Sequence, residues 1–300
     1  MRLGSWIQLS YSGMITALFN RRDPLVGSII LTDKCNLSCK HCAVSNLNGT
    51  VYDYSSIRAD MQTMYSAGVR ILFFYGGEPF MWHDHDFSLR DLAREARQMG
   101  FLLVNIVTNG TFELDVPEAD LILVSLDGGK GNHNKIRGET YDTIVANIRN
   151  SAADNICLYM AINQINKNDI ELLCEVARSL PSVRAVSFNF HTPYPGVEHL
   201  QLTQDEKQDC CNRIVRLMDE GFPILNLRSA FPYIVDNSFK TPCYQCIVME
   251  NGRQWTCGRC LEIPGLCAQC GYFFAAELSL VFRLHLKVVV DLVKTYLRHM

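Results

Sequence analysis

Short apolar runs alternate along the chain with longer stretches in which apolar residues recur every three or four positions. The short runs predict strands, which lie at 27–32, 69–76, 101–108, 119–127, 156–163 and 183–191. The longer stretches predict helices near 54–67, 87–99, 140–152, 168–180 and 203–220. Because hairpin signals are few, we expect an α/β fold of parallel strands joined by helical crossovers. Strands this apolar are expected to be covered on both faces.

Polar and glycine residues follow the first four predicted strands. They are Cys35 after the first strand, Gly76 to Pro79 after the second, Thr108 to Gly110 after the third, and Ser125 and Asp127 at the fourth. In α/β barrels the chemistry lies at the carboxyl ends of the strands. The six strand–helix units predict an open doubly wound sheet or a barrel, with these residues around one mouth.

The alternation stops near Lys240. Residues 241–274 are predicted to be loop-like and contain three Cys-x-x-Cys pairs, whereas 275–300 are predicted to form one amphipathic helix. Its polar stripe consists of Arg283, Lys287, Asp291, Lys294 and Arg298. The broad apolar face of this helix suits packing on the barrel, and the basic stripe also suits contact with an anionic membrane.

Composition narrows the class of protein. The chain has 300 residues, a formal net charge of −3, 48% hydrophobic and 20% charged residues, which is an ordinary globular balance and gives no reason to expect nucleic-acid binding. We find no signal-peptide pattern and no apolar run of about 18–20 residues. The thirteen cysteines are clustered, which favours metal ligands over disulfides and a reducing, cytoplasmic compartment.

Three cysteines, Cys35, Cys39 and Cys42, fall within eight residues after the first strand. A structural zinc site requires four ligands, so three thiolates indicate a metal centre with one coordination position open, or a partial zinc site. Cysteine thiolates are also the usual ligands of iron–sulfur clusters.

The Cys-x3-Cys-x2-Cys loop after a first strand resembles the radical S-adenosylmethionine (radical SAM) superfamily. The resemblance implies a partial (β/α)6 TIM-like barrel over 25–225 and a [4Fe-4S] cluster on Cys35, Cys39 and Cys42. It also implies SAM on the fourth iron and an electron donor such as flavodoxin or ferredoxin. Reductive cleavage of SAM would give a 5′-deoxyadenosyl radical that abstracts hydrogen from a substrate. One departure is His41, where the family usually has an aromatic residue with a phenyl ring.

Further motifs resemble the strand ends of the same family: YGGEP (75–79), TNGT (108–111), VSLDGG (124–129), HNKIRG (133–138) and NQINKND (163–169). The resemblance implies that Glu78 lies at the SAM ammonium and that Arg137 pairs with the SAM carboxylate. The cofactor-binding set implied in this way is Gly76, Gly77, Glu78, Pro79, Asn109, Ser125, Asp127, Arg137 and Asn163. The residues that act directly on the substrate are not identified.

A second cysteine group comprises Cys243, Cys246, Cys257, Cys260, Cys267 and Cys270. It resembles the auxiliary iron–sulfur regions called SPASM and twitch, although their usual spacing is absent. Six thiols suffice for one fully ligated cluster, and we favour Cys243, Cys246, Cys257 and Cys260; structural zinc is the alternative. Cys157, Cys174, Cys210 and Cys211 are expected to pack in the core.

We therefore divide the chain into an N-terminal extension (1–24), the barrel (25–225), a cysteine-rich region (226–275) and a terminal helix (276–300). The relatives it most resembles modify peptides, so a peptide substrate is favoured. A lipid, a small molecule or cofactor precursor remains the alternative, as does a non-catalytic iron–sulfur or zinc protein.

Overall fold

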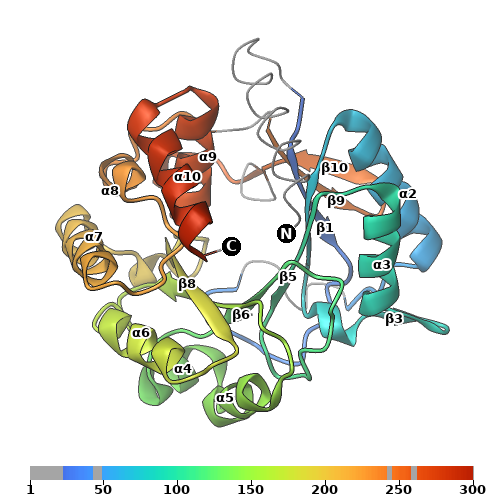
Figure 1. The fold of residues 1–300 in the computed structure, drawn as a ribbon, viewed down its shortest axis with the longest axis horizontal. Coiled ribbons are helices and arrows are strands. Elements are labelled where there is room, and N and C mark those ends of the chain that lie inside the picture. The colour runs from blue at the N-terminus through green and yellow to red at the C-terminus, as the bar shows by residue number, and fades with distance from the viewer. Residues whose placement is uncertain (1–22, 43–48, 242–244, 258–261, 300) are drawn as a thin grey trace.

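In the computed structural model, which describes residues 23–42, 49–241, 245–257 and 262–299, one eight-stranded sheet curves around a central space (Figure 1). The strands in spatial order are β10 (Arg253–Thr256), β9 (Cys246–Glu250), β1 (Val26–Ile30), β2 (Ile71–Tyr75), β5 (Leu103–Thr108), β6 (Leu121–Ser125), β7 (Ile156–Ile162) and β8 (Val183–Phe190). All neighbours are parallel except β10 and β9. Within the described residues no pairing joins β8 to β10, so the barrel is open, as the partial-barrel prediction requires.

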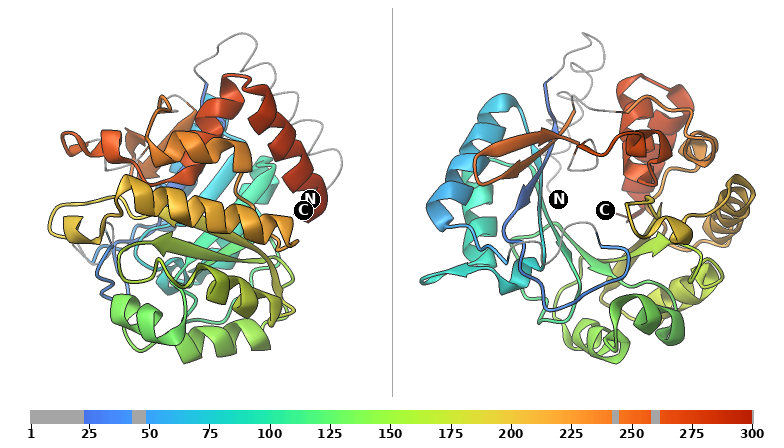
Figure 2. Two further views of the ribbon diagram at one scale, coloured as in Figure 1. Left: turned by 90° about the vertical axis from the view of Figure 1, so that its left-hand side faces the viewer. Right: turned by 180° about the vertical axis from the view of Figure 1, so that it is seen from behind.

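Helices cover the outer face of the sheet, as the views from the side and from behind show (Figure 2). They are α2 (Tyr54–Ala67), α3 (Leu89–Met99), α4 (Lys130–Arg137), α5 (Tyr141–Asn150), α6 (Ile170–Arg178), α7 (Gln204–Asp219) and α8 (Phe231–Val235). All five helices predicted between strands are confirmed, whereas α4 was not predicted. Their starts follow from local capping: the Asp53 carboxylate accepts from the Ser56 N–H at 2.9 Å, and Thr203 with Glu206 forms a capping box for α7.

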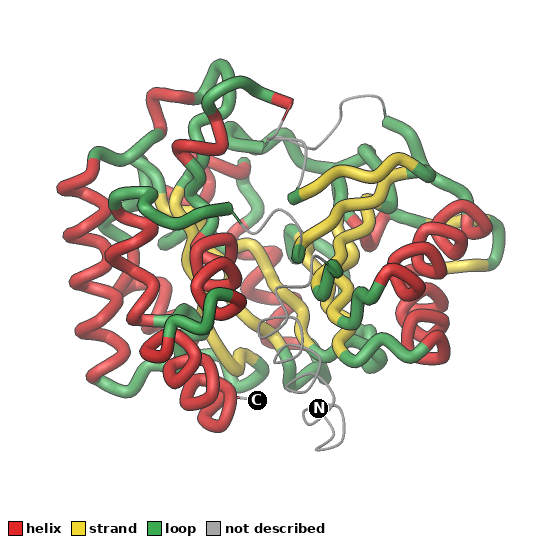
Figure 3. The backbone as a smooth tube through the Cα atoms, turned by 90° about the horizontal axis from the view of Figure 1, so that it is seen from above, coloured by secondary structure: helices red, strands yellow, loops and turns green. Residues whose placement is uncertain are grey.

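Alternate residues of each strand point to opposite faces of the sheet. In β2, Leu72 and Phe74 are fully buried beneath the helices, while the alternate residues Ile71, Phe73 and Tyr75 face the central space and are partly exposed. Figure 1 looks into the open ring of strands with the helices outside it, and Figure 3, seen from above, shows the strands in the middle of the molecule with helices on both sides. The amino-terminal end of the ring is filled by a small apolar cluster that includes Leu121, Cys157 and Ala185.

The loop predicted over 241–274 is wrong for 246–256. There β9 and β10 form a hairpin, and β9 pairs with β1, so the sheet continues into the cysteine-rich region. Asn251 (φ 48°) and Gly252 (φ 77°) occupy the turn with the two positive φ angles of a type I′ hairpin. An Asn-Gly pair between two short strands is the signal that could have predicted this hairpin.

The single helix predicted over 275–300 is also wrong in part, because two helices occupy this segment. They are α9 (Phe273–Phe282) and α10 (Leu286–His299), and Leu284 between them adopts φ 56°. A left-handed residue cannot continue an α-helix, so the chain changes direction there. Figure 1 shows α9 and α10 side by side, next to α8.

Candidate functional site

The cysteine loop leaves β1 at the carboxyl edge of the sheet and is anchored at both ends. At its start, the Thr32 hydroxyl donates to the Thr50 carbonyl at 2.6 Å. At its end, the Lys40 N–H donates to the Ile136 carbonyl of α4 at 3.0 Å. Cys35, Cys39 and Cys42 are therefore held on one loop, between the second strand-to-helix connection and α4.

The three thiols are close enough to influence one another. Burial raises the pKa of Cys39 to about 11, although the nearby Arg137 opposes this, and the charges of Cys42 and Cys35 contribute to the rise. The pKa of Cys35 is raised for the same first reason, with a smaller effect from Cys42. Within the described residues, no three His, Cys, Asp or Glu side chains form a group that could hold a single metal ion.

Three N–H groups are directed at two of these sulfur atoms. Cys35 Sγ accepts from the Leu37 N–H at 3.4 Å and from Asn109 Nδ2 at 3.7 Å, and Cys39 Sγ accepts from Arg137 Nη1 at 3.8 Å. Hydrogen bonds to ligand sulfurs are a common feature of iron–sulfur sites. The donor set of the loop therefore fits a thiolate-bound cluster.

The glycine turn lies directly under the cysteine loop. Gly77 N donates to the Thr32 carbonyl at 2.7 Å, and Glu78 N donates to the Lys34 carbonyl at 2.9 Å. A Cβ atom on Gly77 would lie 2.1 Å from the Lys34 carbonyl oxygen, and one on Gly76 would lie 2.4 Å from that of Thr32. Both glycines are thus required by contact with the protein's own backbone, which our sequence analysis did not foresee.

Glu78 is completely buried, and its carboxylate is surrounded by donors. It accepts from the Thr108 hydroxyl at 2.7 Å, from the Asn109 N–H at 2.7 Å and from the Phe80 N–H at 3.1 Å. Burial nevertheless raises its pKa above the ordinary value. The following residue, Pro79, is buried at the start of a short 3-10 helix (Pro79–Met81).

Asn109 connects the third strand end to the cysteine loop. Its Nδ2 donates to Asn36 Oδ1 at 2.8 Å as well as facing Cys35 Sγ, while its Oδ1 accepts from the Thr111 N–H at 2.9 Å. The ends of β1, β2 and β5 thus meet in one hydrogen-bonded layer.

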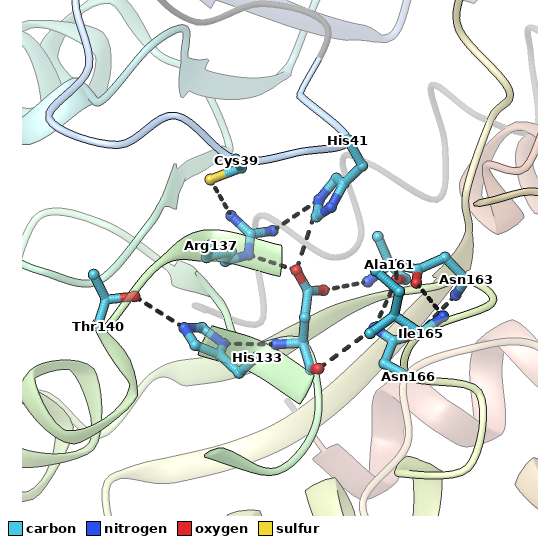
Figure 4. A network of polar contacts seen from close by, with 10 residues as sticks. Cys39, His41, His133, Arg137, Thr140, Ala161, Asn163, Ile165 and Asn166 are labelled. Carbon is cyan, nitrogen blue, oxygen red and sulfur yellow. Dashed lines mark hydrogen bonds and ion pairs between the residues drawn. The ribbon is translucent and has the colours of Figure 1, made fainter. Parts of the chain in front are cut away.

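Asp127 and Arg137 form a buried ion pair beneath the loop (Figure 4). Arg137 Nε donates to Asp127 Oδ2 at 2.5 Å, and the Ala161 N–H donates to Asp127 Oδ1 at 3.0 Å. Burial alone would raise the pKa of Asp127, but Arg137 and His41 outweigh it and lower that pKa. Burial alone would lower the pKa of Arg137, but the nearby charges of Asp127 and Cys39 outweigh it and raise that pKa above its ordinary value.

His133 and His41 flank this ion pair. His133 Nδ1 accepts from the Asp127 N–H at 3.1 Å, so its Nε2 carries hydrogen toward the Thr140 hydroxyl at 3.0 Å. His41 Nε2 lies 3.4 Å from Arg137 Nη2 and 3.6 Å from Asp127 Oδ2, while its buried Nδ1 has no hydrogen-bond partner in the described chain. Burial, the first cause in each case, lowers the pKa of both imidazoles to about 4.

Two other predicted site residues differ in their surroundings. Asn163 is completely buried, and its Oδ1 accepts from the Ile165 N–H at 2.9 Å while its Nδ2 donates to the Ala161 carbonyl at 3.1 Å. Ser125, at the end of β6, is paired in register with Tyr159 of β7. The side chain of Asn163 is therefore used within its own turn, whereas Ser125 faces the central space.

Tyr159 and Asn189 also face the central space, and the sequence analysis missed both. Asn189 Nδ2 donates to the Tyr159 hydroxyl, and its Oδ1 accepts from the Phe273 N–H at 2.7 Å, which ties α9 to the barrel. The alternation of β7, in which Leu158 and Met160 face the helices, is the signal that could have placed Tyr159 on the inner face.

A separate cavity of about 440 Å³ lies at the opposite, amino-terminal edge of the sheet, lined partly by Val116, Ala153 and Arg184.

The second cysteine group is divided between two places. Cys257 N donates to the Cys246 carbonyl at 2.9 Å, so these two residues are neighbours at the amino-terminal end of β9. Cys267 and Cys270 lie on a 3-10 helix (Leu266–Gln269) and its C-cap, next to the carboxyl end of β8, where the Phe190 N–H donates to the Gly271 carbonyl at 2.9 Å. Cys243 and Cys260 lie outside the described residues. Cys157, Cys174, Cys210 and Cys211 are buried, as predicted.

The chain is similar to known proteins in both sequence and fold. The family profile described as the radical SAM superfamily matches residues 29–200. Fe-coproporphyrin III synthase of Methanosarcina barkeri is 28% identical over 244 residues, which is 74% of this chain and 58% of that protein. 7,8-Dihydro-6-hydroxymethylpterin dimethyltransferase of Methanocaldococcus jannaschii is 27% identical over 184 residues, 55% of this chain and 36% of that protein. The chain thus spans only part of the curated relatives it matches.

Among solved structures, Streptococcus suis SuiB bound to the precursor peptide SuiA has 12% sequence identity and a TM-score of 0.63. The match covers 94% of this chain and 70% of SuiB. At this level of identity the likeness shows the fold alone.

Proposed function

The chain belongs to the radical SAM superfamily, and from that premise we propose that it is an enzyme that cleaves SAM reductively at a [4Fe-4S] cluster held by Cys35, Cys39 and Cys42. The observation that carries the proposal is the set of N–H donors on the sulfurs of Cys35 and Cys39. The sulfur of a neutral thiol is only a weak acceptor for such donors, whereas the same donors stabilise thiolates that ligate iron.

When bound, the cluster and SAM supply a 5′-deoxyadenosyl radical that abstracts hydrogen from the substrate. The chain's own residues bind and orient these groups. We propose that Ser125, which faces the central space, contacts SAM directly, and that Gly76, Gly77, Glu78, Pro79 and Asn109 act chiefly by fixing the cysteine loop over the turn. Asp127, Arg137 and Asn163 then complete the layer around the site.

The test is anaerobic reconstitution with iron and sulfide, followed by dithionite reduction in the presence of SAM. We expect a brown protein with absorbance near 400 nm that forms 5′-deoxyadenosine. Replacing Cys35, Cys39 and Cys42 together by alanine should abolish 5′-deoxyadenosine formation and lower the iron content and the absorbance near 400 nm, whereas Cys157→Ala, a buried cysteine of β7, should leave all three intact. Unchanged iron content and product in the triple variant would refute the proposal.

For the substrate we propose a peptide, and the likeness to SuiB over 94% of this chain supports it. A cofactor-type small molecule is the second candidate, favoured by the two curated relatives, which are a synthase of Fe-coproporphyrin III and a dimethyltransferase of a pterin. The rate of 5′-deoxyadenosine formation above the uncoupled background, measured with short peptides and with a porphyrin or pterin, separates the two. A flavodoxin or ferredoxin is the electron donor we propose, and the clustered thiols suit a reducing cytoplasm.

We further propose an auxiliary iron–sulfur cluster in the cysteine-rich region. The contact between Cys246 and Cys257 at one end of the β9–β10 hairpin supports a site there, because it joins one cysteine from each of two Cys-x-x-Cys pairs of the sequence. Cys267 and Cys270, at the other edge of the sheet, would belong to a different site or to none. The double variant Cys246→Ser with Cys257→Ser should lose about half of the iron of the reconstituted protein if both clusters are cubanes; zinc in place of that iron would contradict the proposal.

Peripheral contact with an anionic membrane is a separate proposal, carried by α10. Leu286, Val290, Val293 and Leu297 are 78%, 49%, 49% and 81% exposed and share one face of the helix. The opposite face is buried through Val288, and exposed lysines flank the apolar stripe. No helix among the described residues is long and apolar enough to cross a membrane.

Sedimentation with phosphatidylglycerol vesicles tests the membrane contact. We expect the protein to bind these vesicles and not phosphatidylcholine vesicles, and to lose binding when Leu286 and Leu297 are both replaced by glutamate. Leu172→Glu, at an apolar position 49% exposed on α6, is the matched control. Concentration-dependent dimerisation without vesicle binding would show that a second copy covers the stripe instead.

A further inference from the structure

Arg137 is the last residue of α4, and all three of its side-chain nitrogens have partners (Figure 4). Its Nε donates to Asp127 Oδ2 at 2.5 Å, its Nη1 to Cys39 Sγ at 3.8 Å, and its Nη2 faces His41 Nε2 at 3.4 Å. Only 10% of the side chain is exposed, so the guanidinium exchanges few of these contacts for water. Three of the five guanidinium N–H groups are used in this way, and Asp127 neutralises the charge of Arg137, which makes the side chain a weaker partner for a further anion.

The orientation of the Arg137 side chain is fixed by Asp127. Asp127 is completely buried and is held by the Ala161 N–H on its Oδ1 and by its own N–H on His133 Nδ1. His133 is held in turn by the Thr140 hydroxyl. Because Asp127 cannot turn away, the planar fork of Arg137 presents Nη1 to the sulfur of Cys39 in a fixed geometry.

A permanent N–H donor on a ligand sulfur stabilises the extra negative charge that a cluster gains on reduction. Hydrogen bonds to the sulfurs and solvent exposure are among the factors that set the reduction potential of iron–sulfur clusters. Here the donor is charged and buried, which makes its hydrogen bond stronger than that of a neutral donor. The Asp127 carboxylate offsets the net charge of the guanidinium but leaves the N–H group on the sulfur.

We propose that Arg137 is a positioning residue that acts through the Cys39 sulfur to raise the reduction potential of the cluster, in place of binding the SAM carboxylate. The inference rests on the proposed function, since it needs a cluster on Cys35, Cys39 and Cys42. It assigns to Asp127 the task of aiming Arg137. The step concerned is the one-electron reduction of the cluster by the external donor, which the side chain makes easier without itself changing oxidation state.

The experiment is an EPR-monitored redox titration of the reconstituted full chain without SAM, with SAM affinity measured separately by equilibrium dialysis. In Arg137→Gln the charged donor is lost, and we expect the ratio of reduced to oxidised cluster at a fixed potential to fall about tenfold, which is about 59 mV for one electron. Arg137→Lys keeps the charge but not the fork, so its shift should be smaller. Lys135→Gln removes the same charge from an exposed position of the same helix and should shift nothing.

A second variant guards against misfolding, because Arg137→Gln leaves Asp127 buried without its partner. Arg137→Gln combined with Asp127→Asn replaces the ion pair by two neutral amides, and it should show the same fall in the reduced fraction. An unchanged potential with a tenfold or larger loss of SAM affinity would overturn the proposal and identify Arg137 as a carboxylate ligand. Absence of an EPR-active cluster from the wild-type protein would instead refute the proposed function.

Discussion

Gly77→Ala tests whether the glycine turn serves to hold the cysteine loop. The added Cβ would lie 2.1 Å from the Lys34 carbonyl oxygen, 2.5 Å from the Lys34 carbonyl carbon and 2.7 Å from the Asp33 carbonyl oxygen. All three are backbone atoms, so no side-chain rotation can relieve the overlap. The loop must therefore move away from the turn.

The cost of that movement can be worked from the contacts it breaks. Two buried backbone hydrogen bonds join the loop to the turn, from Gly77 N to the Thr32 carbonyl at 2.7 Å and from Glu78 N to the Lys34 carbonyl at 2.9 Å. Each contributes about 1 kcal/mol, and groups left buried without partners cost about 1–3 kcal/mol more. We expect Gly77→Ala to lower the free energy of unfolding by about 2–4 kcal/mol.

Urea denaturation of the metal-free protein measures this change, and iron content after anaerobic reconstitution measures whether the loop still binds a cluster. We expect both to fall. Gly131→Ala is the control, because a Cβ on Gly131, an exposed position of α4, meets no atom within 4 Å. In that variant alanine should raise stability by about 0.5–1 kcal/mol. If Gly77→Ala matched the wild type in both measurements, the packing argument would be wrong.

Three further predictions concern single side chains. Burial raises the pKa of Glu277 on α9 to about 7, so the folded chain holds a proton that the unfolded chain releases above about 4.3, and stability falls as the pH rises through this window. Glu277→Gln removes that loss, and its free energy of unfolding relative to wild type, measured in urea, should rise by about 1–2 kcal/mol between pH 5.5 and 8, given the partial exposure of the side chain; parallel pH profiles of the two proteins would contradict this. Because His41 Nε2 accepts from Arg137, Nδ1 carries the hydrogen, and this buried N–H group has no partner in the described chain. His41→Phe removes it, and we expect SAM affinity in equilibrium dialysis to fall about fivefold with iron content unchanged. Equal affinity would show that Nδ1 donates to another group. Cys157→Ala should lower stability by about 1 kcal/mol in urea without loss of iron, and a drop in iron would make this thiol a ligand.

The parallel part of the fold could be predicted from the sequence because each strand is a separate apolar run and each crossover helix has its own period. Every predicted strand from 27–32 to 183–191 matches an observed strand within two residues at each end, and the sheet order follows the chain order from β1 to β8. Local signals are sufficient when neighbours in sequence are also neighbours in space.

The same reasoning could not predict where the β9–β10 hairpin joins the sheet. Its pairing with β1 joins Cys246 to Val26, residues more than two hundred positions apart, and no local period specifies such a contact. The apolar core of β9 is short and lies between cysteine pairs that dominated the interpretation of the segment. The cysteine spacing of this segment predicted only a metal site, and it gave no signal for the strand that the same residues add to the sheet.

At the site, the sequence predicted which strand ends meet but not which atoms they would contact. Gly76 and Gly77 were expected to belong to the cofactor-binding set, whereas in the structure they accommodate the carbonyl groups of Thr32 and Lys34. Arg137 was expected to bind a carboxylate outside the chain, and the carboxylate it contacts is that of Asp127. Both differences have one physical cause. A buried polar group must be satisfied in the folded chain whether or not a ligand is bound, so its first partner is usually another part of the protein.

That cause also indicates where a ligand should be sought. Buried residues whose polar atoms all have hydrogen-bond partners within the chain, such as Glu78 and Asn163, shape the site. Buried polar atoms without such partners are the candidates for hydrogen bonds to a ligand. His41 Nδ1 is such an atom, and His41 lies between two of the three clustered cysteines. The position at which this chain departs from its family thus carries a buried donor without a partner in the described chain, and we expect SAM to accept from it, which the His41→Phe variant tests.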